Sequence, residues 1–412
     1  MPTIPRPWFL ALLLLAVAVA VPATVPVAVQ AGALPPPAAP AARALAPTGA
    51  DAITIEDRGV TIDFPQQIVF RAHIAAGSPI QRVVLEYGVE KLTCGTVTAK
   101  ALPPITPAPA LDVTWTWDMR KSGAEPPGAR LWYRWHVTDQ AGHEQVSERK
   151  RVVWLDQKHP WQSARQEQLT LHWYNGTQAF ANELLAAGTG ALRQLQQTTG
   201  VHDTAPIDLY IYANADDMRD ATLYEPGWTG GQAFPTADIV IIGIAPDQLD
   251  WGRQTVAHEL THVLVGHLTF SCLSSVPTWL NEGIAVYGEG GPDAAMRDQL
   301  RAAIAADTLI SVPALSGGFS EHADKADLSY VESYSLVNYL VSTFGPDRMR
   351  DLFAALHDGR TIEEALQATY NLNLAGLEAA WRQAIGARPP AAAVATAVVS
   401  ATAVPTYPPI AA

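Results

Sequence analysis

The segment HELTH at residues 258–262 is the sequence feature that most constrains the fold of this chain. Its two histidines are four residues apart, so a helix places both imidazoles on one face, one turn apart, where they can share a metal ion. Val256, Leu260 and Val263 surround them with apolar positions. The pattern predicts a buried helix that carries a metal site; the competing interpretation is an amphipathic helix with surface histidines.

Zinc suits this donor set, because it binds neutral imidazole nitrogen at about 2.0–2.1 Å and keeps a position open for water in catalytic sites. Glu259 follows the first histidine and is placed to take a proton from that water, whose pKa the metal lowers to about 7. We therefore predict that His258 and His262 bind one Zn²⁺ ion and that Glu259 is the general base.

A third ligand decides the class of zinc site. A glycine three residues and a histidine six residues after His262 would complete one pattern, but those positions hold Val265 and Leu268. His267 lies about 140° round the helix from His262 and is predicted to serve the end of the helix instead of the metal.

Glu282 in TWLNEGIAVYGEG is the alternative third ligand. It lies between Leu280 and Ile284, and a carboxylate in such an apolar setting needs a partner, for which a metal ion is suited. Pro277 and Thr278 provide a helix start just before it. The competing interpretation is an exposed acid in the first turn, stabilised by the helix dipole.

The composition indicates a folded protein of several domains. The chain has 412 residues, is 48% hydrophobic and 16% charged, and carries a formal net charge of −13. So acidic a chain, without a basic run, is not expected to bind nucleic acid.

The N-terminus predicts export. Arg6 is the only charged residue before the apolar run WFLALLLLAVAVAV, and small residues follow, as in a signal peptide over residues 1–33. An uncleaved anchor is the alternative, because residues 8–42 carry no charge, although Pro22 and Pro26 interrupt the apolar run.

Two domains are predicted between a Pro/Ala-rich linker at 34–50 and a flexible Ala/Pro-rich tail at 387–412. Residues 51–156 hold about seven β-prone stretches separated by turns, which predicts an all-β sandwich of immunoglobulin or fibronectin type. Residues 157–386 alternate strands and helices and then become mostly helical, which predicts an α+β domain.

The stretch ARLWYRWHV in the first of these domains alternates clearly, with Leu131, Tyr133, Trp135 and Val137 on one face. The two cysteines, Cys94 and Cys272, fall in different predicted domains. In an oxidising compartment they can pair and clamp the domains together, or they can be two separate buried thiols, and the sequence leaves both open.

HELTH, nineteen intervening residues and the glutamate of WLNEGIAVY resemble the gluzincin zinc metallopeptidases, and most closely the bacterial peptidase MA-like group of exported proteins. The resemblance covers roughly residues 169–385. It implies that His258, His262 and Glu282 bind the zinc ion and that Glu259 is the base. It also implies that GWTGGQAFPTADIVIIG contains an edge strand above the zinc, which pairs with an extended substrate.

The chain departs from this family at one position. Many gluzincins have an aspartate four residues after the third ligand, hydrogen-bonded to a zinc histidine, and here that residue is Val286. Asn281 or a backbone carbonyl is the candidate to orient the imidazole instead.

The resemblance further implies that an oxyanion donor comes from the later segment SYVESYSLVNYLVSTFG, which is predicted to be a helix. Tyr334 is the first choice, with Tyr330 and His322 as alternatives, and a packing role is the competing interpretation for the tyrosines.

The sequence thus predicts an exported zinc metallopeptidase that acts on peptides or proteins, with possible association of the β domain with a cell surface. The alternative is an extracellular binding or structural protein that keeps the metallopeptidase fold with little or no turnover. An autoinhibited form, with the N-terminal region over the cleft, also stays open.

Overall fold

The computed structural model describes residues 52–200, 202–223, 230–319 and 323–390, all within a unit formed by residues 48–412. The predicted signal peptide and linker, the residues of the tail after 390, and His322 lie outside the described residues. No described helix is both long and apolar enough to cross a bilayer.

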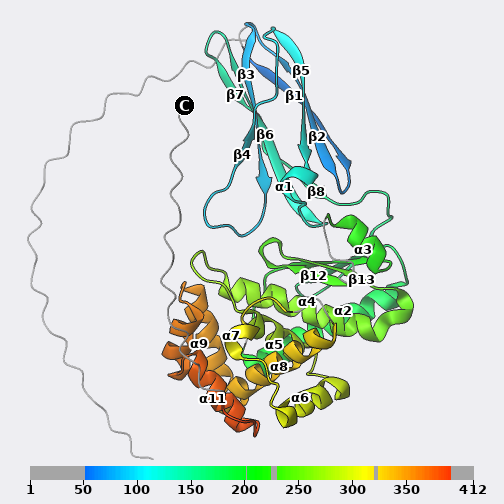
Figure 1. The fold of residues 1–412 in the computed structure, drawn as a ribbon. Helices are drawn as coiled ribbons and strands as arrows, with labels where there is room; N and C mark the ends of the chain where they lie inside the picture. The colour runs from blue at the N-terminus through cyan, green and yellow to red at the C-terminus, as the bar shows by residue number, and fades with distance from the viewer. Residues whose placement is uncertain (1–51, 201, 224–229, 320–322, 391–412) are drawn as a thin grey trace, which may run out of the picture. The chain divides into compact units, whose positions relative to one another are not determined.

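The N-terminal part consists of two antiparallel sheets that share one core (Figure 1). One sheet has the order β1-β2-β5, and the other has the order β4-β3-β6-β7, with β8 also paired to β6. The strands are β1 (Thr54–Asp63), β2 (Gln67–Ala75), β3 (Ile80–Val89), β4 (Ala99–Ala101), β5 (Ala110–Asp118), β6 (Ala129–Asp139), β7 (Glu144–Val146) and β8 (Lys150–Trp154).

The predicted alternation in β6 is confirmed, because Leu131, Tyr133, Trp135 and Val137 are all buried in this core. The aromatic and β-branched side chains fill the space between the sheets, which is the main force that holds such a pair together.

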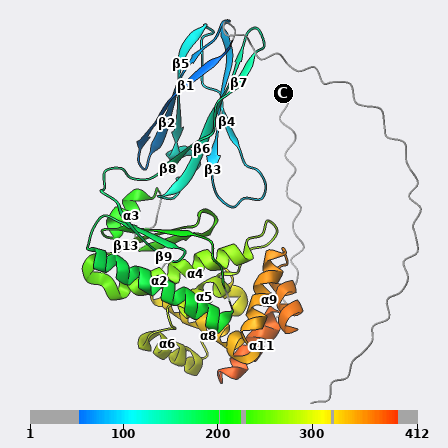
Figure 2. The ribbon, with the colours of Figure 1, turned by 180° about the vertical axis from the view of Figure 1, so that it is seen from behind.

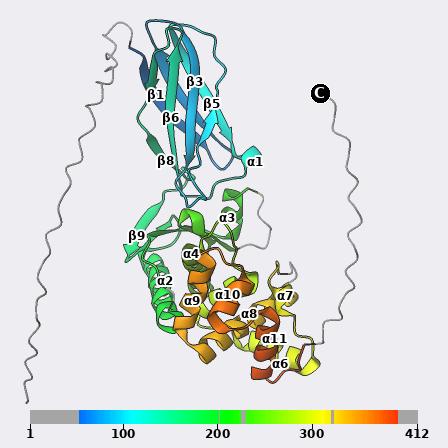
Figure 3. The same cartoon turned by 90° about the vertical axis from the view of Figure 1, so that its left-hand side faces the viewer.

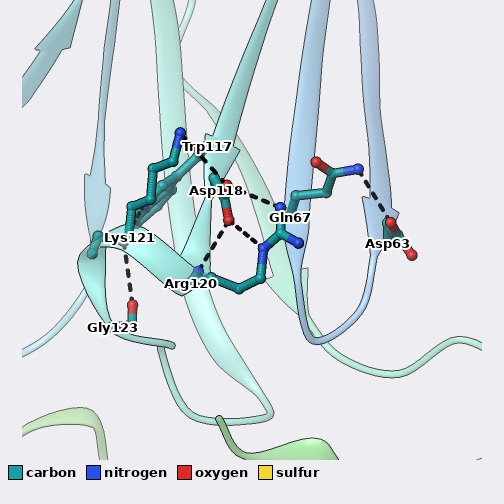
Figure 4. Close-up of polar contacts among 8 residues, drawn as sticks. Asp63, Gln67, Trp117, Asp118, Arg120, Lys121 and Gly123 are labelled. Atoms are coloured by element: carbon teal, nitrogen blue, oxygen red, sulfur yellow. Dashed lines mark hydrogen bonds and ion pairs between the residues drawn. The ribbon is translucent and has the colours of Figure 1, made fainter. Parts of the chain in front are cut away.

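Polar side chains form hydrogen bonds at the strand ends of the first sheet. Asp118 ends β5 and caps the short helix α1 (Met119–Ser122): its carboxylate accepts hydrogen bonds from the backbone N–H of Arg120 at 3.1 Å and from its Nε at 2.8 Å (Figure 4). In the β1–β2 turn, Gln67 Nε2 donates to Asp63 Oδ2 at 3.1 Å. The contact with Arg120 N–H satisfies a backbone donor at the start of α1, and the other two contacts join side chains.

A third, mixed sheet follows with the order β12-β13-β11-β10-β9. The strands β10, β11 and β13 are parallel, and the antiparallel strands β9 and β12 form the two edges. Consistent with burial on both faces, β13 reads IVIIG and every residue in it is buried. The strands are β9 (Gln162–Gln166), β10 (Leu169–Trp173), β11 (Ile207–Tyr212), β12 (Gly231–Phe234) and β13 (Ile239–Gly243).

Helices α2 and α4 cover one face of this sheet and share a core with it (Figure 2). Side chains on the opposite face, such as Tyr210 and Ile241, belong to the core of the N-terminal sheets. The later helices pack around a further core that includes Trp279 and Trp381 (Figure 3). The helices are α2 (Gln178–Thr199), α3 (Ala215–Ala221), α4 (Leu249–Thr269), α5 (Thr278–Gly288), α6 (Ala294–Ala306), α7 (Val312–Leu315), α8 (Ala323–Phe344), α9 (Pro346–His357), α10 (Ile362–Tyr370) and α11 (Leu374–Ala384).

Cys94 and Cys272 form a disulfide, so the question that the sequence left open is answered in favour of pairing. The bridge joins the segment between β3 and β4 to the segment between α4 and α5, across 178 residues. A crosslink over so long a loop restricts the unfolded chain strongly.

Replacing both cysteines with serine should therefore lower the free energy of unfolding by about 2–4 kcal/mol. Denaturant titration of the double variant and the oxidised wild type measures the difference, and the reduced wild type should match the variant. Equal midpoints for all three proteins would contradict a stabilising bridge.

Candidate metal centre and cleft

The centre of the site is built on α4, which spans the HELTH segment. Val256, Leu260 and Val263 are fully buried and hold the helix against the sheet. His258 and His262, one turn apart, lie with ring centroids 4.7 Å apart. The helix predicted from the apolar spacing is therefore present, and it turns both imidazoles the same way.

Helix α5 brings Glu282 to these histidines. Its Oε2 lies 3.4 Å from His258 Nε2 and 3.4 Å from His262 Nε2. Among the described residues, these three are the group of potential ligands whose donor atoms all lie within 4.8 Å of one another.

This geometry fits zinc. Tetrahedral ligands at about 2.0–2.1 Å from an ion lie about 3.3 Å from one another, close to the two nitrogen–oxygen separations seen here. Two imidazoles and a carboxylate also form one of the usual donor sets of catalytic zinc, which leaves a fourth position for water or substrate. The residues present thus suit one Zn²⁺ ion.

Charge in the site is balanced by close pairing. Burial raises the pKa of Glu282, but the hydrogen bonds with His258 and His262 outweigh it and hold the pKa of this carboxyl well below its usual range. Burial lowers the pKa of His258, but Glu282 and Glu289 outweigh it and raise the pKa of the metal-free site to about 10, so a metal ion that binds Nε2 displaces a proton from this ring. The carboxylate is therefore ionised at neutral pH, as a metal ligand must be.

Glu289 is a contact that the sequence did not predict. It follows the end of α5, and its Oε1 lies 2.5 Å from His258 Nδ1, which donates to it. Asn281 instead donates to Glu282 Oε1 at 3.5 Å, while His258 Nδ1 is hydrogen-bonded to Glu289. The hydrogen bond that orients the imidazole, which Val286 cannot accept, thus goes to the carboxylate of Glu289, three residues later.

The predicted base lies beside the ligands. Glu259 is buried at 9% exposure, and burial raises the pKa of its carboxyl, offset in part by His258 and His262. The edge strand β12 passes close above it: a Cβ added to Gly231 would lie 3.0 Å from Glu259 Oε1. A larger residue at position 231 would therefore press on this carboxylate and on the side chain of Thr255.

A cleft runs past the site on both sides of Gly231. One part, of about 470 Å³, is lined by the three ligands and by Gln232 and Ala233 of β12. The other, of about 350 Å³, is lined by Trp251 and Glu289. His258, Glu259 and Tyr330 line both. Within the described residues β12 pairs with β13 alone, so its other edge is the one to which an extended segment could add as a strand.

The structure separates the two candidate tyrosines. Tyr330 lines the cleft, with its ring centroid 6.2 Å from that of His258. Tyr334 stacks on Tyr287 instead, and its hydroxyl lies 3.1 Å from where a Cβ of Gly291 would be. One turn of α8 displaces it about 6 Å along the helix axis. The geometry therefore favours Tyr330 over the first choice, Tyr334.

His267 is not part of the ligand group. Its Nδ1 lies 2.6 Å from Asp203 Oδ2 and its Nε2 lies 2.8 Å from Asp238 Oδ1. The prediction that it does not share the ion agrees with this placement, but its partners are two carboxylates and the carbonyl of Pro235, not the last carbonyls of α4.

Several solved structures are similar to parts of this chain. The M1 zinc metallopeptidase from Deinococcus radiodurans has 13% identity and a TM-score of 0.34, over 77% of this chain and 90% of that one. An aminopeptidase N family protein from Idiomarina loihiensis has 8% identity and a TM-score of 0.38, over 78% and 73%. Wild-type OgpA from Akkermansia muciniphila has 7% identity and a TM-score of 0.21; the match takes 26% of this chain and spans only 28% of OgpA.

TM-scores this low carry no argument about function, and no curated protein matches the sequence. The family comparison is more specific, because the profile of the Peptidase MA superfamily matches residues 187–387, which include α4, α5 and α8. The resemblance read from HELTH and Glu282 is thereby confirmed at the level of the superfamily. Residues 187–387 form a domain of the Peptidase MA superfamily.

Proposed function

We propose that this protein is a zinc-dependent metallopeptidase that hydrolyses peptide bonds in an extended peptide or protein substrate. One observation carries the proposal: the ligand atoms of His258, His262 and Glu282 meet beside the buried carboxylate of Glu259, under an open sheet edge. This combination supplies a Lewis acid site, a base and a place for the substrate backbone together.

Each residue of the site has its own role in the proposed hydrolysis. A zinc ion on the three ligands would polarise the substrate carbonyl and lower the pKa of a water molecule. Glu259, buried beside the three ligands, takes the proton from the attacking water and gives it to the leaving amine. Glu289 holds the Nδ1–H of His258, so that Nε2 faces the metal position.

Tyr330 is the proposed oxyanion donor. Burial raises the pKa of its hydroxyl, and the charges of Glu282 and Glu259 raise it further, so the hydroxyl keeps its proton at neutral pH. It can therefore donate a hydrogen bond to the oxygen on which negative charge develops.

We further propose export, with residues 1–33 as a signal peptide or an anchor. The disulfide supports this location, because disulfides persist in oxidising compartments outside the cytosol. The proposed organisation is a linker at 34–50, a sandwich of immunoglobulin or fibronectin type at 51–156, the peptidase domain at 157–386 and a tail at 387–412.

The test uses purified full-length protein on unfolded casein and on a quenched peptide library, with metal analysis of the same sample. We expect one zinc ion per chain, cleavage that a chelator abolishes, and recovery when zinc is added back. Absence of bound zinc after purification and reconstitution would overturn the proposal. Stoichiometric zinc without cleavage of any library peptide would instead favour the binding protein.

A further inference from the structure

The third histidine of the segment HELTHVLVGH has a built environment of its own. His267, in the last turn of α4, has a side chain only 8% exposed, held between the carboxylates of Asp203 and Asp238 at 2.6 and 2.8 Å. Burial lowers the pKa of His267, but Asp238 and Asp203 outweigh it and raise the pKa. A carboxylate oxygen lies at each ring nitrogen, an arrangement that suits the charged ring, which donates from both nitrogens.

These contacts fix a turn next to the cleft. Asp238 ends the 3₁₀ turn Pro235–Ala237, which connects β12 to β13, and it has a positive φ of 61°. Pro235 packs directly on α4, since a Cβ added to Gly266 would lie 2.2 Å from the Cβ of Pro235. His267 Nε2 also lies 3.1 Å from the carbonyl oxygen of Pro235. The end of the edge strand is thus fastened to α4.

Helix α4 also carries His258, Glu259 and His262, five to nine residues before His267. The first residue of β12, Gly231, lies against Glu259 of this group. The strand is therefore held to α4 at both ends, by close packing at Gly231 and by the charged contacts at His267. The spacing between them determines how far the open edge of β12 lies from the metal position.

We propose that His267 is a positioning residue, whose imidazole holds the β12–β13 turn on α4 and so keeps the edge strand at the spacing from which it pairs with an extended peptide. The peptide part rests on the proposed function; the positioning part does not. A second contact reaches the turn from the other side, because Leu92 N–H donates to Thr236 O at 2.8 Å. That contact comes from the segment that the disulfide anchors, so it can be perturbed separately.

The test is His267→Gln, which keeps a polar side chain but cannot bridge two carboxylates with a positive charge. The matched control is His357→Gln: His357 is also in the last turn of a helix, α9, and contacts Phe270 O at 2.9 Å outside the cleft lining. Hydrogen exchange of β12 and its turn, zinc content, and kcat and KM on extended peptides are measured for both.

We expect His267→Gln to keep its zinc while the amides of residues 231–234 and 236–238 exchange about ten-fold faster or more, because a hydrogen bond to a charged group is lost. KM for extended peptides should rise by a similar factor, with a smaller change in kcat. His357→Gln should show none of these local effects. Asp238→Asn, which tolerates the same backbone conformation, should give an intermediate acceleration of exchange.

Unchanged exchange at residues 231–238 in His267→Gln would overturn the proposal, as would faster exchange spread evenly over the core strands, since that indicates a merely structural role. If His267→Gln does not fold, Asp238→Asn decides by the same exchange readout. If wild-type protein cleaves no peptide, the proposed function fails, but the exchange data still decide whether His267 positions the strand.

Discussion

Replacing Glu259 with glutamine should leave one zinc ion bound per chain and lower kcat on a peptide substrate by about 10²–10⁴-fold. Glutamine matches the side chain in size but cannot accept a proton at neutral pH. The metal should remain, because Glu259 is not one of the three ligand-forming residues. Metal analysis and steady-state kinetics on the same preparation give both numbers.

The size of this effect follows from the isolation of the carboxylate. Glu259 is buried, and the Cβ-free backbone of Gly231 closes over it. When Glu259 loses its negative charge, no base remains at that position to take a proton from the attacking water. Because an amide is less costly to bury than a carboxylate, the variant should be no less stable than the wild type.

Glu183→Gln is the matched control. Glu183 lies on the neighbouring helix α2 and pairs with Arg253 of α4 at 2.7 Å, but its side chain is 53% exposed and does not line the cleft. It should keep wild-type zinc content and kcat. Near wild-type kcat in Glu259→Gln would show that a different group is the base, and loss of zinc together with activity would contradict a separate role for Glu259.

The sequence could predict the parts of the site that are local. The spacing of His258 and His262 needs only a helix to bring the rings together, and the apolar positions around them predict that helix. Glu282 was found because an acid among buried apolar residues needs a partner. Each of these inferences depends on fewer than ten neighbouring residues.

The parts that depend on packing between distant elements could not be predicted. Glu289 reaches His258 because α5 ends at Gly288, and the exact end of a helix is poorly determined by sequence. Gly231 lies in a Gly-rich stretch that gives no sign of its approach to Glu259. The partners of His267 come from two turns far away in the chain.

The N-terminal sheets show a related limit. The β-prone stretches AITIED and VTIDF predict two separate strands before residue 65. The structure instead has the single strand β1, in which the pairing register shifts between Asp57 and Val60. Gly59 between them has a φ of 76°, so a bulge lets the ladder continue where a turn was predicted. Conversely, the β-prone stretch QVSERKRVVW at 145–154 predicts one strand, and it divides into β7 and β8.

The two tyrosines of α8 offer the sharpest comparison between sequence and structure. Tyr330→Phe should lower kcat by about 10²–10³-fold, since it removes a single donor to the developing oxyanion. Tyr334→Phe removes the same hydroxyl one turn away, where the ring stacks on Tyr287, and should change kcat little. Both substitutions preserve the aromatic ring, so folding and zinc content should stay at wild-type levels.

Steady-state kinetics of the two variants on one peptide measure the difference, and a hydrolysis-resistant phosphorus-containing transition-state analogue tests its cause. The analogue should lose affinity for Tyr330→Phe by about the factor lost in kcat, because it carries the charged oxygen that the hydroxyl contacts only in the transition state. A substrate-like peptide should bind both variants equally. A large loss of kcat in Tyr334→Phe with none in Tyr330→Phe would contradict the assignment and return the donor to the residue that the sequence first favoured, through a movement of α8 toward the cleft.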